Sequence, residues 1–208
     1  MLRLAYLVLV GVFVVSYALL AHYTNVAGTE TLGTIVALAP LLVAAVSLTW
    51  QLRHHKVVPV LFVVGCVVLA MAWGRLEKHY SLIYWLEHVG TQLFLCHIFG
   101  RTLLDGREPL VSYFARMIQG PLTPPLQTYT RAVTKAWVFF FAGMALVSTL
   151  LYLLVSIEGW SIFANFVTAP MIGLMFIAEY LVRRRLHPKM EHVPILEGVK
   201  AYWKHPAR

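Results

Sequence analysis

Few residues of this chain are charged, and almost none are cysteine. Asp, Glu, Lys and Arg make up 12% of the 208 residues and hydrophobic residues 60%, whereas soluble domains average about 25% and about 45–50%. So little charge excludes an intrinsically disordered chain. Two cysteines, Cys66 and Cys96, exclude a disulfide scaffold. A soluble protein of this composition would expose large apolar patches to water, so the composition predicts a membrane protein.

Six apolar segments are long enough to cross a bilayer. The apolar core of a bilayer is about 30 Å thick and needs about 20 mostly apolar residues in a helix. The six segments are 4–21, 32–50, 57–73, 82–104, 136–157 and 162–182, and the fourth is the most polar. The first is too long for the apolar part of a signal peptide and lacks a small-residue cleavage site. We therefore predict an all-α polytopic protein in which residues 1–182 form a six-helix transmembrane domain.

The basic residues predict the orientation of these spans. If the N-terminus is inside, all but two of the 17 lysines and arginines lie on the cytoplasmic side, the exceptions being Arg75 and Lys78. Cytoplasmic segments carry such an excess, so both termini are predicted to be cytoplasmic. The net charge of +8 then reflects topology and attraction to anionic headgroups, and no nucleic-acid partner is expected.

Two cytoplasmic segments have the pattern of interfacial helices. In the long loop 105–135, apolar residues recur after Pro109 with helical spacing until prolines divide the loop. The basic tail 183–208 repeats this design. These helices would lie in the membrane interface, either as anchors or as a platform for an acidic protein or an anionic lipid. The apolar positions are Leu110, Val111, Phe114, Met117 and Ile118 in the loop, and Ile195, Leu196, Val199, Tyr202 and Trp203 in the tail.

Ionisable side chains inside the spans are costly and are therefore candidates for function. Glu87, His97 and Glu179 are the candidate acids or bases. In the fourth span His97 lies one turn from Arg101. In the sixth span Asn165, Glu179 and Arg183 share a stripe, and Glu179 precedes Arg183 by four residues in the favourable order. Each has a structural alternative: Glu179 with Arg183 and His97 with Arg101 as simple pairs, and Glu87 as a residue near the predicted outer interface.

Common catalytic and cofactor motifs do not occur. The sequence has no H-E-x-x-H, no G-x-S-x-G, no H-x-x-x-x-D and no phosphate-binding glycine loop. Its nine histidines do not place two on one face of any span, so no metal or haem is predicted. Pro40 and Pro170 are expected to kink the second and sixth helices, because each removes a backbone donor.

Two sequence runs resemble a known family. They are Tyr129-Thr130-Arg131-x-Val133-Thr134-x-x-Trp137-x-Phe139-Phe140 and Phe176-x-x-Glu179-Tyr180-x-Val182-Arg183-Arg184-Arg185. These runs resemble a family of bacterial inner-membrane proteins encoded in aryl polyene and xanthomonadin-type pigment clusters, beside acyl carrier proteins, synthases and acyltransferases. The resemblance is most specific over residues 99–185. The matching motif positions are Tyr129, Arg131, Thr134, Trp137, Glu179, Tyr180, Arg183 and Arg184.

The resemblance implies a location in the bacterial cytoplasmic membrane and a role in making, anchoring or exporting a polyketide-like or fatty-acid-like chain. It assigns no catalytic residue. The leading hypothesis is an accessory protein that docks acyl-carrier machinery or handles its lipid product at the cytoplasmic face. An intramembrane enzyme acting on a lipid or polyene chain and a small transporter subunit are the alternatives. Candidate residues for substrate or partner binding are Tyr129, Arg131, Trp137, Asn165, Glu179, Arg183, Arg184 and Arg101.

Overall fold

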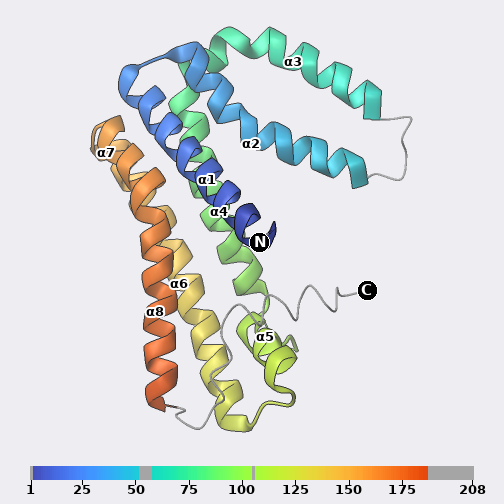
Figure 1. Cartoon of the computed structure of the whole chain (residues 1–208), viewed down its shortest axis with the longest axis vertical. Coiled ribbons are helices and arrows are strands. Elements are labelled where there is room, and N and C mark those ends of the chain that lie inside the picture. Colours follow the sequence, from blue (N-terminus) through green and yellow to red (C-terminus); the bar gives the residue numbers. More distant parts are fainter. Residues whose placement is uncertain (1, 52–57, 105, 187–208) are drawn as a thin grey trace. The chain divides into compact units, whose positions relative to one another are not determined.

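The computed structural model describes residues 2–51, 58–104 and 106–186, with side chains omitted at 2–4, 7, 48–51, 58, 59 and 61. All regular secondary structure in these residues is helical, with no strand. The all-α prediction is therefore confirmed for the described chain (Figure 1). The helices are α1 Leu2–Ala27, α2 Glu30–Gln51, α3 Val58–Lys78, α4 Tyr80–Arg101, α5 Leu110–Gln119, α6 Pro124–Leu154, α7 Ile157–Ile162, the π-helical turn η1 Phe163–Val167, and α8 Thr168–Leu186.

Four of the described helical segments are long and apolar enough to cross a membrane. They are Val8–Ala27, Glu30–Ser47, Pro124–Leu154 and Ile157–Leu186. They correspond to the first, second, fifth and sixth predicted spans, which supports a membrane protein. The predicted spans 57–73 and 82–104 coincide with α3 and α4, which are helical but are not among the four. The count of six spans and the orientation therefore stay predictions.

The helix bounds correct the predicted loop between the fourth and fifth spans. The helix expected after Pro109 is present as α5, and it ends at Gly120, whose φ of 78° is easy only for glycine. However, α6 begins at Pro124, twelve residues before the predicted start of the fifth span. Prolines are tolerated in a first helical turn because the N–H groups there have no intrahelical partner. The tail helix expected after residue 183 lies outside the described residues beyond 186.

The sixth predicted span contains a π-helical turn shortly before Pro170, where a kink is expected. The helix widens at η1, and the backbone N–H and the hydroxyl of Thr168 both bond to the carbonyl of Phe163, five residues back. Pro170 follows two residues later. Its ring would collide with the carbonyl four residues earlier in a regular α-helix. π-helix occurs mostly as single turns of this kind inside α-helices, and η1 ends three residues before Pro170.

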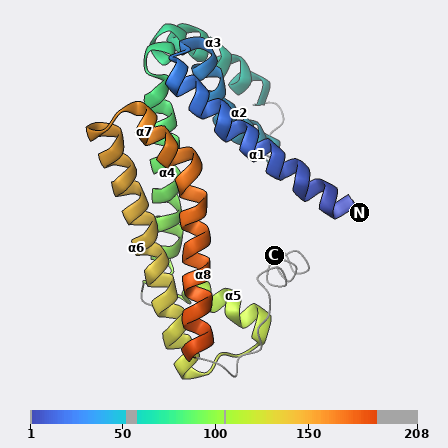
Figure 2. The ribbon, with the colours of Figure 1, turned by 60° about the vertical axis from the view of Figure 1, so that its left-hand side comes forward.

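The chain divides into two units, each with its own core. Unit 1 comprises the described parts of 1–88 and 148–168, and unit 2 those of 89–147 and 169–186. In unit 1, α2 and α3 run side by side (Figures 1 and 2), and α1 packs against α7. Gly33 permits the ring of Tyr80 to approach the backbone of α2, since an added Cβ would lie 2.6 Å from its Cδ2. The buried core of unit 1 consists of Ala21, Val36, Ala37, Tyr84 and Trp160.

Unit 2 is built on one buried stripe of α6. Residues spaced three or four apart lie on one face of a helix, and five buried residues of α6 follow this spacing. Aromatic rings of α4 and α8 pack on the stripe. The ring centroids of Phe99 and Phe141 are 5.4 Å apart, and those of Phe176 and Trp137 are 4.7 Å apart. In both views the unit 2 parts of α6 and α8 are neighbours (Figure 2). The stripe consists of Leu126, Tyr129, Val133, Trp137 and Phe141.

Candidate binding site on helices α6 and α8

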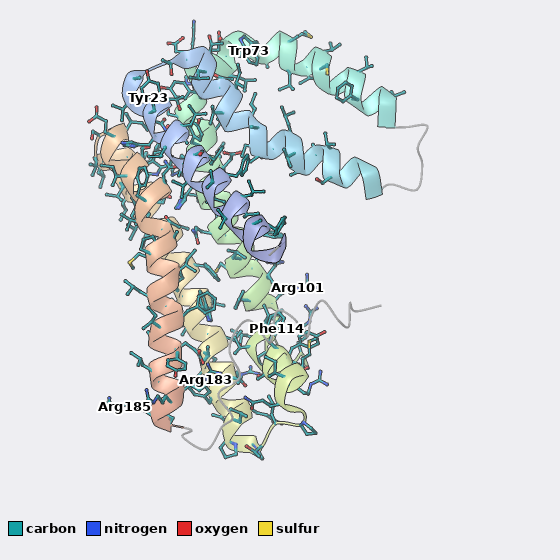
Figure 3. All side chains as sticks on the ribbon, in the orientation of Figure 1. Tyr23, Trp73, Arg101, Phe114, Arg183 and Arg185 are labelled. Carbon is teal, nitrogen blue, oxygen red and sulfur yellow. The ribbon has the colours of Figure 1, made fainter. Side chains whose placement is uncertain are left out.

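A polar cluster joins α6 to the last turns of α8 in unit 2. The Tyr129 hydroxyl donates to the backbone carbonyl of Glu179 at 3.3 Å and to its Oε1 at 3.2 Å. The Arg183 Nε lies 3.4 Å from the same carboxylate oxygen. We call Tyr129, Glu179 and Arg183 the α6–α8 cluster. It lies at the end of α8 where Arg183 and Arg185 are labelled in Figure 3.

Local sequence explains half of this cluster. Glu179 and Arg183 are four residues apart on α8, so their side chains lie on one face with the acid nearer the N-terminus. Arg183, Arg184 and Arg185 fall in the last turn of α8, where cations interact favourably with the helix dipole. The predicted ion pair is therefore confirmed. Tyr129 comes from 50 residues away, and its place on the buried stripe of α6 brings its hydroxyl to Glu179.

Arg131 belongs to a different contact. Its Nη2 donates to the backbone carbonyl of Leu103 at 2.9 Å, just beyond the end of α4. That carbonyl lies beyond the helix, where no intrahelical donor follows. Tyr129 and Arg131, two positions apart on α6, thus face different neighbours. Sequence reasoning grouped them at one interface, whereas the structure assigns them to separate contacts.

The remaining predicted residues of unit 2 differ in exposure. Trp137 is buried at 5% exposure and packs in the aromatic core, so it supports the cluster from within. Arg184, His97 and Arg101 are exposed. The Arg101 carbonyl accepts a 3.5 Å bond from Arg107. No hydrogen bond joins His97 to Arg101 among the described residues, so the structure does not pair these two side chains.

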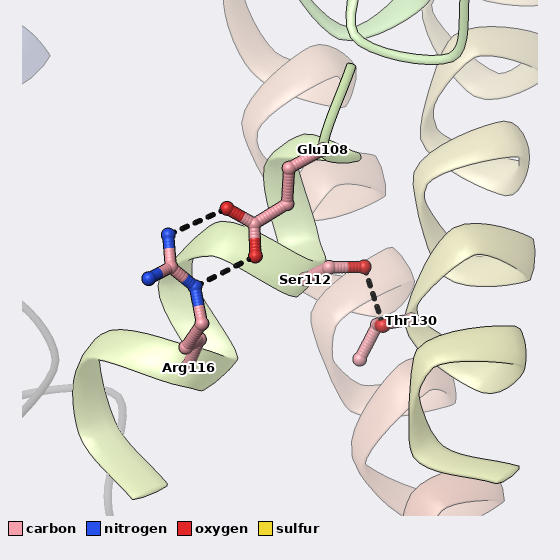
Figure 4. A network of polar contacts seen from close by, with 4 residues as sticks. All are labelled: Glu108, Ser112, Arg116 and Thr130. Atoms are coloured by element: carbon pink, nitrogen blue, oxygen red, sulfur yellow. Dashed lines mark hydrogen bonds and ion pairs between the residues drawn. The ribbon is translucent and has the colours of Figure 1, made fainter. Parts of the chain in front are cut away.

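α5 docks on α6 through polar contacts. The Ser112 hydroxyl lies 2.6 Å from that of Thr130, and both side chains are buried (Figure 4). The Val111 N–H donates to Thr134 Oγ1 at 3.3 Å. Sequence analysis placed Val111 on a face turned to lipid, but this residue packs against the core of unit 2. Phe114, from the same predicted face, is exposed.

On its outer side α5 carries an exposed ion pair. Arg116 binds Glu108 with two hydrogen bonds, of 2.8 and 2.6 Å (Figure 4). The hydrogen bond and the negative charge of Glu108 raise the pKa of Arg116 above its ordinary value. Glu108 therefore has its charge compensated within unit 2.

The described part of unit 2 has a large excess of positive charge. It contains eight lysines and arginines but only two glutamates, Glu108 and Glu179. Each glutamate already pairs with an arginine, so six basic side chains have no carboxylate partner among the described residues. We call them the basic set. Its members are Arg101, Arg107, Arg131, Lys135, Arg184 and Arg185.

Two predicted site residues lie in unit 1, in surroundings of their own. Asn165 donates to the carbonyl and to the hydroxyl of Ser161, at 2.9 and 3.2 Å. Glu87 is half-buried, and its carboxyl group lies within electrostatic range of the Tyr17 and Tyr84 hydroxyls. Neither residue joins the α6–α8 cluster, so the stripe predicted for the sixth span is divided between two environments.

Unit 1 contains a polar network around His88 that sequence reasoning missed. The ring of His88 bridges two hydroxyls, with Nδ1 2.9 Å from Ser148 and Nε2 2.9 Å from Thr168. The Trp160 indole N–H donates to the same Ser148 oxygen at 3.0 Å. Serine and threonine within apolar helices often form such interhelical bonds, and this was the available signal. No cluster of three metal-ligating side chains occurs among the described residues.

Comparison of the chain with protein families, curated proteins and solved structures finds no match. Its function has therefore to be inferred from its own residues.

Proposed function

We propose that the protein is an accessory component of a lipid pathway in the bacterial inner membrane, with six spans and cytoplasmic termini. The pathway is of the fatty-acid or polyketide type that makes aryl polyenes. In this role the protein docks the acyl-carrier machinery, or handles its lipid product, at the cytoplasmic face. The basic set of unit 2 carries the proposal, because both described glutamates there are already paired.

Acyl carrier proteins are acidic, and complementary charge steers and orients such encounters. Arg184 and Arg185 are suited to this role because both are exposed, at the end of α8. Arg131 is less suited, because its guanidinium already donates to a backbone carbonyl. The docking contact is therefore assigned mainly to the exposed members of the basic set.

The test is co-purification of an acidic acyl carrier protein of such a pathway with the detergent-solubilised full chain at low ionic strength. The double variant Arg184→Glu/Arg185→Glu is expected to lose the association. The matched control is Arg75→Glu/Lys78→Glu, which reverses two exposed basic residues of unit 1 that are predicted to face the other side. The control should bind as well as the natural chain.

Because exposed charges act through a screened field, binding should also weaken as salt is added. If the Arg184 and Arg185 variant retains the carrier protein at low ionic strength, or if both double variants lose it equally, docking by this surface is wrong.

A further inference from the structure

The guanidinium of Arg183 is oriented by two contacts on α8. Its Nε lies against Glu179, and the centre of its guanidinium lies 5.9 Å from the centroid of the Tyr180 ring, within cation–π range. Its two Nη groups have no hydrogen-bond partner among the described residues. The side chain is partly buried, at 24% exposure. Arg183 thus presents an oriented pair of donors, the geometry that binds the two oxygens of a phosphate or a carboxylate.

The neighbouring carboxylate does not occupy this donor pair. Glu179 Oε1 receives the Tyr129 hydroxyl as well as the Arg183 Nε, so its charge is compensated from two sides. Arg184 and Arg185 follow directly in the sequence and add positive charge at the same helix end. An incoming anion therefore meets net positive charge here.

On the N-terminal side of Arg183, the surface of α8 carries two aromatic rings. Phe176 and Tyr180 precede Arg183 by seven and three residues, so all three lie along one side of the helix. Phe176 is 43% and Tyr180 38% exposed. Seven residues of α-helix span about 10 Å. An oxyanion at Arg183 and an apolar chain along these two rings would match this surface in both charge and polarity.

We propose that Arg183 binds the anionic headgroup of a membrane lipid whose acyl chain lies along Tyr180 and Phe176. This inference rests on the proposed function, since it names the ligand class through which the protein handles lipid. Arg183 is the donor to the headgroup, whereas Glu179 and Tyr129 are positioning residues that orient its guanidinium. The occupant is a lipid rather than free phosphate, because the aromatic stripe would otherwise contribute nothing.

The test uses the full chain in phosphatidylcholine nanodiscs that contain a small fraction of dioleoyl phosphatidic acid, with lipid retention counted by native mass spectrometry. Arg183→Gln is expected to lower retention about tenfold, the equivalent of one charge-assisted hydrogen bond. Arg183→Lys keeps the charge but not the paired donors, and should lose most of the retention too. Arg184→Gln is the comparison variant: Arg184 is exposed and adds only a screened charge to this helix end, so its loss should lower retention by less than twofold.

Equal losses in Arg183→Gln and Arg184→Gln would mean general attraction to a basic surface and would overturn the site. Full retention in Arg183→Lys would overturn the paired-donor geometry. A third arm adds inorganic phosphate or phosphatidic acid to the protein in neutral detergent and measures the rise in its thermal midpoint. An equal rise with both would overturn the lipid assignment. Unchanged helix content by circular dichroism shows that each variant is folded.

Carrier co-purification of Arg183→Gln separates this inference from the proposed function. Loss of lipid with the carrier retained supports the lipid site. If the natural chain shows no preference for phosphatidic acid while its carrier binding still depends on Arg184 and Arg185, the lipid site is wrong and docking stands.

Discussion

Ser148 is expected to be the most costly single hydroxyl to remove from unit 1. Its Oγ is fully buried at 0% exposure. It accepts the indole N–H of Trp160 at 3.0 Å and lies 2.9 Å from His88 Nδ1. Ser148→Ala removes that oxygen and leaves the indole N–H of a core tryptophan without an acceptor. The change therefore tests whether this network stabilises the packing of unit 1.

The expected magnitude follows from two limits. An unsatisfied buried donor costs about 1–3 kcal/mol, whereas interhelical hydrogen bonds measured in membranes average about 0.6 and reach about 1.7 kcal/mol. Because Ser148 serves two partners in a site without exposure, we expect a loss of about 1–2 kcal/mol in the free energy of unfolding. A value well above this range would point to repacking around Trp160.

The assay is reversible unfolding of the purified chain in mixed micelles with increasing sodium dodecyl sulfate, followed by circular dichroism and tryptophan fluorescence. Ser47→Ala is the matched control, because the Ser47 hydroxyl is exposed and donates to the Val43 carbonyl of its own helix. Ser47→Ala should change the free energy by less than about 0.5 kcal/mol.

A double-mutant cycle with Trp160→Phe isolates the indole bond. Once the indole N–H is absent, Ser148→Ala should cost less than it does in the natural chain. An equal cost in both backgrounds, or a cost of Ser148→Ala no greater than that of Ser47→Ala, would refute the reasoning.

Three further changes each test one contact, the first in unit 1 and the other two in unit 2. Gly33→Ala places a Cβ 2.6 Å from a ring carbon of Tyr80 and should lower the free energy of unfolding by about 1–3 kcal/mol, measured in the same micelles. Ser112→Ala removes the buried bond between α5 and α6; a loss of about 1 kcal/mol should appear as faster protease cleavage before α5. Glu108→Gln should lower the raised pKa of Arg116, yet leave the thermal midpoint unchanged at neutral pH, because the pair is exposed.

Each of these changes has a control or a contrary outcome. A Cβ added at Gly65 meets no described atom within 4 Å apart from the adjacent residues and backbone of its own helix. Gly65→Ala should therefore be neutral or stabilising, and a loss equal to that of Gly33→Ala would contradict the clash. Thr128→Ala changes an exposed hydroxyl bonded within α6, and cleavage before α5 should stay at its natural rate. Because its raised pKa keeps Arg116 charged at all lower pH values, any contribution of the ion pair to stability would be lost only as the pH rises through that pKa. A drop in the midpoint of Glu108→Gln at neutral pH would show that the pair matters for stability.

The prolines show where local rules reach their limit. Pro109 precedes α5 as predicted, because its fixed φ suits a helix start. Pro124 and Pro125 are among the prolines expected to divide the loop 105–135, although the same property lets them begin α6. Whether a proline ends or starts a helix depends on what the following residues bury, and here they form the stripe of the unit 2 core.

The sequence by itself determined that this is a helical membrane protein, because hydrophobic length and the period of a helix are local properties of the chain. It also determined the Glu179–Arg183 pair, whose partners are one turn apart. Only the tertiary structure decided that Tyr129 completes this pair while Arg131 turns to Leu103, and that His88 meets Ser148 and Thr168. These contacts join residues 28 to 80 positions apart. In an apolar helix many faces are equally hydrophobic, so the pattern of residues does not say which face meets which neighbour; the packing of the helices decides it.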